Sequence, residues 1–217
     1  MQAKLKRERN SSYLDTGPRL DATIATSSIR RIAQWRRRYP DHKIENLRGN
    51  INTRLRKLKE SKWHGAIFAA AGLERINLRP QNAIELDWML PAPAQGAIMI
   101  VCREDDEFSF SSCHSINHEE TALCTKIERD FLSGLMGGCS TPISALAQIK
   151  NDEVLFKGEI IDPDDPQSGV ARINGGSPVA QASDMGLKFA ESLLSNSSMK
   201  GIIERIRNKG LTPDGQV

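Results

Sequence analysis

The sequence predicts an α/β domain followed by a small α+β domain. Between residues 20 and 90, short apolar runs alternate with segments whose apolar residues recur every three or four positions, as in parallel βαβ units. Later in the chain, apolar runs at 143–149 and 154–161 flank Asn151-Asp152, which favours an antiparallel hairpin. Helical patterns follow this hairpin, so the second domain is predicted to be α+β.

The α/β domain is predicted to begin with a strand at Asp21–Thr26. The helix that follows can be capped by Ser27 or Ser28 and must end at Pro40, because proline cannot continue a helix. The alternation then continues through strand 43–48, helix 51–58, strand 65–70 and helix 71–78.

Three further segments complete the predicted organisation. Residues 1–19 show no sustained periodicity and are predicted to be an irregular lead-in. Residues 91–112 form a connecting segment with a buried strand at 97–102 (AIMIVC). Residues 113–217 form the α+β domain. Its predicted elements are a helix capped by Asn117 and Glu120 and ended by Gly137-Gly138, the hairpin, a third strand at 170–173, and helices at 185–194 and 201–206.

The composition is that of a soluble globular protein, with 39% hydrophobic and 26% charged residues. The longest apolar stretch, 92–102, is too short to span a bilayer. No secretory signal follows Met1, so the cytoplasm is the expected location. The cysteines form no CxxC pair and are therefore expected to be free thiols: Cys102, Cys113, Cys124 and Cys139.

Positive charge is concentrated in residues 30–62, although the net charge of the chain is only +3. Two interpretations remain open for this run: a solvated basic face, or a surface that binds a polyanion.

Two strand-to-helix turns within this run are candidate anion sites. Thr26-Ser27-Ser28 offers hydroxyls and backbone N–H groups at a helix start, and Arg30 and Arg31 follow at once. Arg48 and Arg54 flank a similar turn at Gly49-Asn50. Because arginine holds carboxylates through paired donors, the two turns suggest a ligand with several acidic groups. Ordinary caps and surface arginines are the alternative.

Cys139 lies in the segment MGGCSTP, where two preceding glycines would leave its sulfur accessible on a loop. The residues alone favour a small buried hydrophobe, because the sequence places no catalytic histidine beside this cysteine.

A metal site is not expected. Cys113, His114, His118 and Cys124 do not have the spacing of structural zinc sites. His118-Glu119 begins like a metalloprotease HExxH motif, but Ala122 stands where the second histidine would be needed.

Five segments, in their order and spacing, resemble those of the hydroxymethylbilane synthases, also called porphobilinogen deaminases. The segments are TSSIRR at 26–31, LRGN with TRL at 47–55, AAGL at 70–73, PAQGA at 93–97, and GGC with Pro142 at 137–142. The resemblance covers roughly residues 20–210.

This resemblance implies an enzyme that joins four porphobilinogen units, with release of ammonia each time, into hydroxymethylbilane for tetrapyrrole synthesis. The family grows this chain on a dipyrromethane primer held by a thioether. The implied cofactor-binding residues are Cys139, Ser27, Ser28, Arg30 and Arg31, and the implied substrate-binding residues are Arg48 and Arg54. A periplasmic-binding-protein-like α/β fold and, for a complete protein, a monomer are implied as well.

The chain departs from the family in one respect. The family's catalytic aspartate lies in a His-Ser-x-Lys-Asp segment of the first domain, whereas His114-Ser115 here continues with Ile116-Asn117. No catalytic residue is therefore assigned. Most of the first domain is expected to be missing, and residues 91–112 would be the segment in which the family's chain returns to that domain. The strand at 97–102 would then lack its sheet and be prone to aggregation or to pairing with another chain.

The chain alone is consequently not expected to polymerise porphobilinogen at a normal rate. A non-catalytic anion-binding module is the alternative function, and nucleic-acid binding through residues 30–62 is less favoured because no nucleic-acid motif is present.

Overall fold

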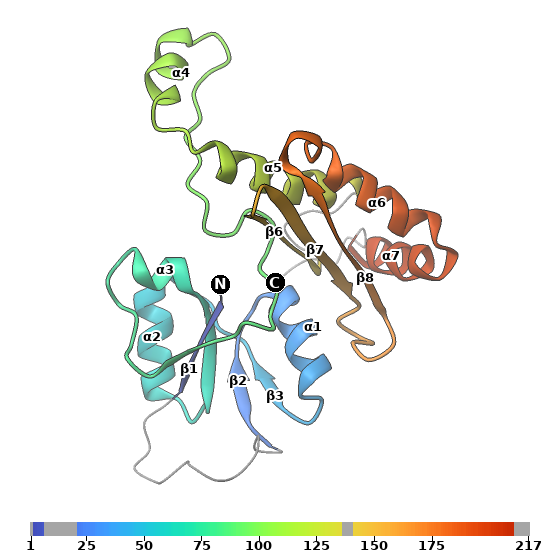
Figure 1. Cartoon of the computed structure of the whole chain (residues 1–217). Helices are drawn as coiled ribbons and strands as arrows, with labels where there is room; N and C mark the ends of the chain where they lie inside the picture. Colours follow the sequence, from blue (N-terminus) through green and yellow to red (C-terminus); the bar gives the residue numbers. More distant parts are fainter. Residues whose placement is uncertain (1, 7–20, 136–140, 211–217) are drawn as a thin grey trace.

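The first half of the chain builds a five-stranded sheet in the order β3-β2-β4-β1-β5, in a computed structural model that describes residues 2–6, 21–135 and 141–210 (Figure 1). Its strands are β1 (Gln2–Lys6), β2 (Thr23–Ala25), β3 (Lys43–Glu45), β4 (Gly65–Ala69) and β5 (Ala83–Glu85). The central pairings of β2 with β3 and with β4 are parallel, as predicted from the βαβ alternation.

Helices cover both faces of this sheet because its side chains alternate in direction. Ala25 and Phe68 pack with α2 (Ile51–Glu60) and α3 (Ala70–Glu74) on one face. Ile24 and Ile67 pack on the other face against Trp35 of α1 (Ile29–Arg38). Three layers result, and the predicted α/β class is confirmed for this half of the chain.

Strand β1 contradicts the prediction that residues 1–19 are entirely irregular. It lies antiparallel between β4 and β5, with Ala3 opposite both Phe68 and Glu85. Its backbone groups complete the hydrogen bonding of two neighbours, so the strand needs no apolar periodicity of its own. The rest of the lead-in, 7–19, and Met1 lie outside the described residues.

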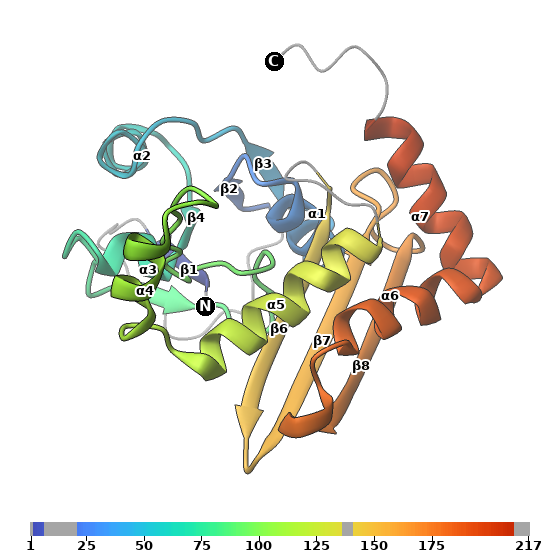
Figure 2. The ribbon, with the colours of Figure 1, turned by 90° about the horizontal axis from the view of Figure 1, so that it is seen from above.

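The second half of the chain folds around an antiparallel sheet in the order β6-β7-β8. Its elements are β6 (Ile143–Lys150), β7 (Glu153–Ile161), β8 (Val170–Pro178), the 3-10 turn Val179–Gln181, α5 (Glu119–Gly134), α6 (Met185–Ser195) and α7 (Ser197–Gly210). The hairpin is confirmed, with Asn151 and Asp152 both at positive φ, 51° and 61°, as a tight two-residue turn requires. Figure 2 shows α5 and α6 lying side by side along one face of this sheet.

One prediction for the connecting segment and one for the helix that follows it are wrong. Residues 97–102 form no strand, because none of the described strands pairs with them. The helix expected to start after Asn117 starts after His118 instead, whose Nδ1 accepts a hydrogen bond from the Thr121 N–H at 3.2 Å. An additional helix, α4 (Glu107–His114), stands clear of both sheets in Figure 1.

None of the described helices is long and apolar enough to cross a membrane.

The packing of α5 against α6 can be tested at Gly186. A Cβ added there would lie 2.1 Å from the carbonyl oxygen of Ile127, so the two helices would have to move apart. We expect Gly186→Ala to lower the free energy of unfolding by about 1–3 kcal/mol, measured by urea denaturation. Gly201→Ala is the matched control, because a Cβ there meets nothing within 4 Å and alanine should stabilise α7 by roughly 0.5–1 kcal/mol. Equal effects of the two changes would contradict this packing.

Candidate ligand site

A small hollow of about 200 Å³ lies where β2 passes into α1. Its lining residues come from three elements and the turns between them: Thr26, Ser27, Ser28, Arg31, Leu47, Arg54 and Ile67. Four residues proposed from the sequence, Ser27, Ser28, Arg31 and Arg54, are therefore brought together.

The hydroxyl groups of Thr26 and Ser27 stabilise the Thr26–Ser28 turn that lines the hollow. The Ser27 hydroxyl accepts a hydrogen bond from the Leu47 N–H at 2.8 Å and donates to the Asn46 carboxamide oxygen. The Ser28 N–H donates to Oγ1 of Thr26 at 3.3 Å. Ser28 occupies the cap position of α1, but its side chain makes no capping hydrogen bond. The positive end of α1 therefore faces the hollow without a capping oxygen from Ser28.

Arg31 is the buried cation of the site, with only 9% of its surface exposed. Its guanidinium donates to the carbonyl oxygen of Ile67 at 3.1 Å and to the side-chain oxygen of Gln95 at 3.4 Å. Burial, followed by repulsion from Arg54 and Arg30, lowers the pKa of Arg31 to about 10. Three arginines thus share one region, and an anionic ligand would relieve both the repulsion and the loss of hydration.

The remaining predicted arginines are placed differently. Arg54 donates from Nε to the carbonyl oxygen of Gly49 at 2.6 Å, which holds it at the start of α2. Arg48 is exposed and does not line the hollow. Arg30 donates from Nε to the carbonyl oxygen of Ile143 at 2.7 Å and so reaches the second half of the chain. Cys139 lies outside the described residues.

Some of the basic residues at 30–62 hold the two halves of the chain together, rather than forming a solvated face or a surface that binds a polyanion. Arg37 donates to the carbonyl oxygens of Pro166 and Gln167 at 2.8 and 2.7 Å, and the Gln167 amide donates to the carbonyl oxygens of Arg36 and Arg37. These cations bind the loop between β7 and β8, so they join the two halves of the chain.

The linker between the halves is fixed by a carboxylate that the sequence analysis missed. Glu128, only 5% exposed on α5, accepts hydrogen bonds from the N–H groups of Ala94 at 2.6 Å and Ala147 at 2.8 Å. Burial raises the pKa of Glu128, and these two hydrogen bonds partly offset the shift. Ala94 has a positive φ of 57°, and the next residue, Gln95, contacts Arg31. One available signal was an acidic residue directly beside Ile127 in the apolar stripe of α5.

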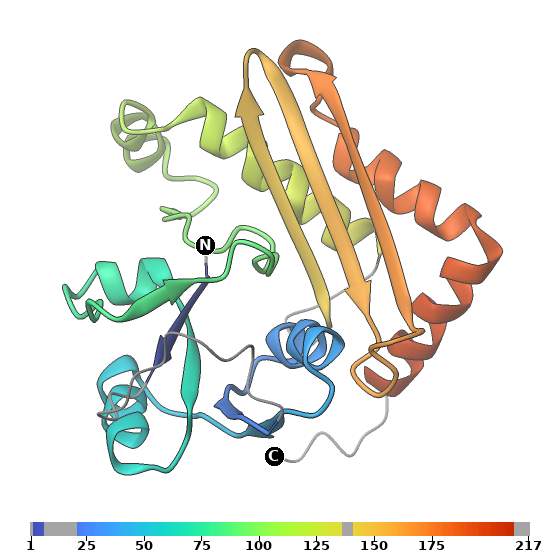
Figure 3. The ribbon, with the colours of Figure 1, turned by 60° about the horizontal axis from the view of Figure 1, so that its bottom comes forward.

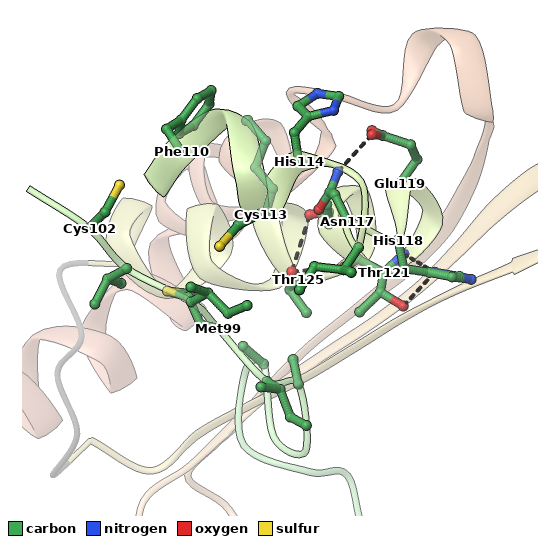
Figure 4. A pocket seen from close by; sticks show the side chains of 18 of the residues that line it. Met99, Cys102, Phe110, Cys113, His114, Asn117, His118, Glu119, Thr121 and Thr125 are labelled. Atoms are coloured by element: carbon green, nitrogen blue, oxygen red, sulfur yellow. Dashed lines mark hydrogen bonds between the residues drawn. The ribbon is translucent and has the colours of Figure 1, made fainter. Parts of the chain in front are cut away.

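Residues 97–102, called here the apolar segment, line a separate groove with α4 and α5 (Figure 4). Ile98 and Val101 are 79% and 80% exposed, and Phe108 of α4 is 83% exposed. The sequence analysis expected a buried strand at this position, and the side chains are exposed instead. Cys102, Cys113 and His118 also line the groove, but no cluster of metal-ligating side chains occurs in the described ranges.

An α/β unit with an arginine-lined hollow at a strand-to-helix turn, joined to a small α+β unit, defines an anion-binding class of protein. Two family models match: porphobilinogen deaminase, dipyromethane cofactor binding domain, over residues 5–110, and porphobilinogen deaminase, C-terminal domain, over residues 122–195. The chain belongs to the porphobilinogen deaminase family, and the resemblance found in the sequence is confirmed.

Individual relatives carry the same name. The porphobilinogen deaminases of Desulforamulus reducens and Brevibacillus brevis are 39% and 38% identical over 201 and 202 residues, each covering 92% of this chain. The chloroplastic porphobilinogen deaminase of Oryza sativa subsp. japonica is 44% identical over 146 residues, or 66% of this chain and 41% of its own length. The chain spans 64% of the length of the two bacterial relatives.

The hollow predicts how arginine changes affect anion binding. Arg54→Ala should weaken binding of a polycarboxylate such as mellitate about tenfold or more, because a charge-assisted hydrogen bond contributes roughly 1.5–3 kcal/mol. Arg54→Lys should recover part of the affinity, since lysine cannot form the paired contact. Arg56→Ala is the matched control, because Arg56 lies on the same helix but is 64% exposed and paired with Glu60. Isothermal titration would measure all three, and equal losses in Arg54→Ala and Arg56→Ala would contradict the site.

We expect the exposed apolar segment to cause self-association of the chain. Charged residues introduced into it should suppress that self-association. Replacing both Ile98 and Val101 by lysine should shift the chain toward smaller species in sedimentation velocity, because two charges oppose burial of the segment. Leu78→Lys, at an apolar residue 41% exposed outside the groove, should change little. If the double variant sediments like the wild type across concentrations, the segment is not a contact surface.

Proposed function

We propose that this chain contributes the cofactor- and substrate-binding surfaces of a hydroxymethylbilane synthase, which polymerises four porphobilinogen units with release of ammonia. The observation that supports this most is the hollow itself. It combines a desolvated arginine, a second arginine and two serines at a strand-to-helix turn, within the segment matched by the dipyromethane cofactor binding domain.

The side chains present suit a dipyrromethane cofactor. Each pyrrole of the substrate bears an acetate and a propionate, so a growing oligopyrrole is a polycarboxylate. We assign Ser27, Ser28, Arg30 and Arg31 to the cofactor carboxylates. Support comes from the repulsion among Arg30, Arg31 and Arg54, which a bound anion would relieve. When bound, the dipyrromethane would supply the end to which new pyrrole units are added.

Cys139 is the proposed attachment point. The described chain resumes at Thr141, and Ile143, four positions after the cysteine, accepts the hydrogen bond from Arg30. A residue of the cofactor turn is thus tied to the chain close to the proposed thioether. Of the other three cysteines, Cys102 and Cys113 lie in or next to the connecting segment and Cys124 lies on α5.

We assign Arg48 and Arg54 to the incoming substrate. Arg54 lines the hollow, and exposed Arg48 would contact pyrroles that extend beyond it. Holding carboxylates binds ground state and transition state alike, so these residues would not by themselves accelerate ammonia loss. We therefore assign no catalytic acid to this chain.

Finer features of the family are proposed as well. Parallel strands with helices on both faces, and a ligand turn at the end of β2, support a periplasmic-binding-protein-like arrangement. We propose a cytoplasmic location and, for the complete protein, a monomer. Nucleic-acid binding is less favoured because Arg36 and Arg37 are engaged with the loop after β7.

A non-catalytic anion-binding module is the remaining alternative, and covalent loading separates the two. Supplied with preformed hydroxymethylbilane, the chain should gain a covalent oligopyrrole visible in its intact mass, because the Cys139 thiol can displace water from the hydroxymethyl carbon to form the thioether. Cys139→Ser should lose this adduct, because only a thiol at that position can form the thioether, whereas Cys102→Ser, Cys113→Ser and Cys124→Ser should retain it.

An adduct mapped to any other cysteine would refute the assignment of Cys139. Saturable polycarboxylate binding without any adduct would instead support the non-catalytic module.

A further inference from the structure

The buried side chain of Gln34 joins three parts of the molecule: helix α1, the linker that follows Met89, and strand β6. It lies on α1, one turn after Arg30, and is 5% exposed. Residues four apart share one face of a helix, so Arg30 and Gln34 both point toward β6. Figure 3 shows this helix lying between the first sheet and one end of β6.

The Gln34 carboxamide uses both its donors and its acceptor. Its nitrogen donates to the carbonyl oxygen of Leu90 and to the hydroxyl of Ser144, each at 3.0 Å. Its oxygen accepts a hydrogen bond from the Leu90 N–H at 2.8 Å. Gln34 and Ser144 are 5% and 2% exposed, so the hydrogen bond between them is shielded from water, while Leu90 is half-buried. Removing the amide would therefore leave buried polar groups unpaired.

The hydrogen-bond partners of Gln34 lie in the linker and at the start of β6, and these two segments also bond to each other. Leu90 starts the linker, and the carbonyl oxygen of the next residue, Pro91, accepts a hydrogen bond from the Ala145 N–H at 3.1 Å. Ser144 is the second residue of β6, next to Ile143, which Arg30 holds. Helix, linker and strand thus meet at one amide, and the same helix begins at the arginine-lined hollow.

We propose that Gln34 is a positioning residue for cofactor attachment: it fixes the start of β6, which lies four positions after Cys139 in the sequence, relative to the hollow. This inference rests on the function proposed above. Gln34 does not line the hollow, so it would act on geometry and leave the affinity for carboxylates unchanged. Arg54, which lines the hollow, would act on affinity.

The test compares Gln34→Met with Gln148→Met, the same change at an exposed residue of β6. Adduct formation is followed by intact mass over time at a series of hydroxymethylbilane concentrations. Gln34→Met should lower the maximum rate on the order of 10- to 100-fold while the half-saturating concentration stays within about threefold of wild type. Gln148→Met should match the wild type. A normal maximum rate in folded Gln34→Met, or a loss confined to half-saturation, would overturn the proposal.

Two further measurements keep the outcome decisive. Ser144→Ala removes one partner and leaves the Leu90 contacts, so it should show a smaller fall in maximum rate even if Gln34→Met does not fold; a normal rate in Ser144→Ala would then count against the proposal. A wild-type chain that gains no adduct at all would count against the proposed function instead.

In that case hydrogen exchange of the folded variants still tests Gln34. Faster exchange at both Leu90 and Ala145 in Gln34→Met would show that the amide holds linker and strand together. Unchanged exchange at Ala145, which does not contact Gln34 directly, would overturn the positioning role.

Discussion

The buried polar contact between α1 and the start of β6 is the interaction on which the arrangement of the two halves depends. Arg30, Gln34 and Arg37 each donate hydrogen bonds to groups of the second half of the chain. Most of these contacts end on backbone carbonyls, whose positions are fixed by their own strands and loops. An interface of this kind specifies one orientation, because a displaced donor would leave a buried group without its partner.

The same helix also contributes to the hollow. Its first turn lines the hollow through Ser28 and Arg31, so any movement of α1 relative to β6 also moves the proposed cofactor site. The linker adds a further connection, because Glu128 holds Ala94 while the neighbouring Gln95 contacts Arg31. Binding geometry and domain geometry are therefore set by one continuous group of hydrogen bonds.

Much of the fold could be predicted from local patterns, and what was missed depends on distant partners. The βαβ alternation and the Asn151-Asp152 hairpin were predicted because their signals lie within a few residues. Strand β1 was missed because it is defined by pairing with residues at least 59 positions away. The apolar segment was expected to be a buried strand because its composition is apolar, whereas forming a strand requires a partner that the described residues do not supply.

The residues of the candidate site likewise fall into two groups, those predictable from local sequence and those that depend on distant partners. Ser27, Ser28, Arg31 and Arg54 could be found because a strand-to-helix turn followed by arginines has a local physical meaning. Gln34 could not, since a glutamine on a helix gives no sign of which backbone groups it will meet. For Glu128 the one local signal was its place beside Ile127 in the apolar stripe of α5. The contact of Arg30 with Ile143 joins residues 113 positions apart, so it too lay beyond local patterns.

A crystal structure of the chain after exposure to hydroxymethylbilane would test the central claim most directly, since that claim concerns where the carboxylates of the cofactor bind. The account predicts a pyrrole adduct on the Cys139 sulfur, with its carboxylates within hydrogen-bonding distance of Arg31 and of the Ser27–Ser28 turn. A loaded chain whose carboxylates contact other residues, with the arginine-lined hollow free of ligand, would contradict it.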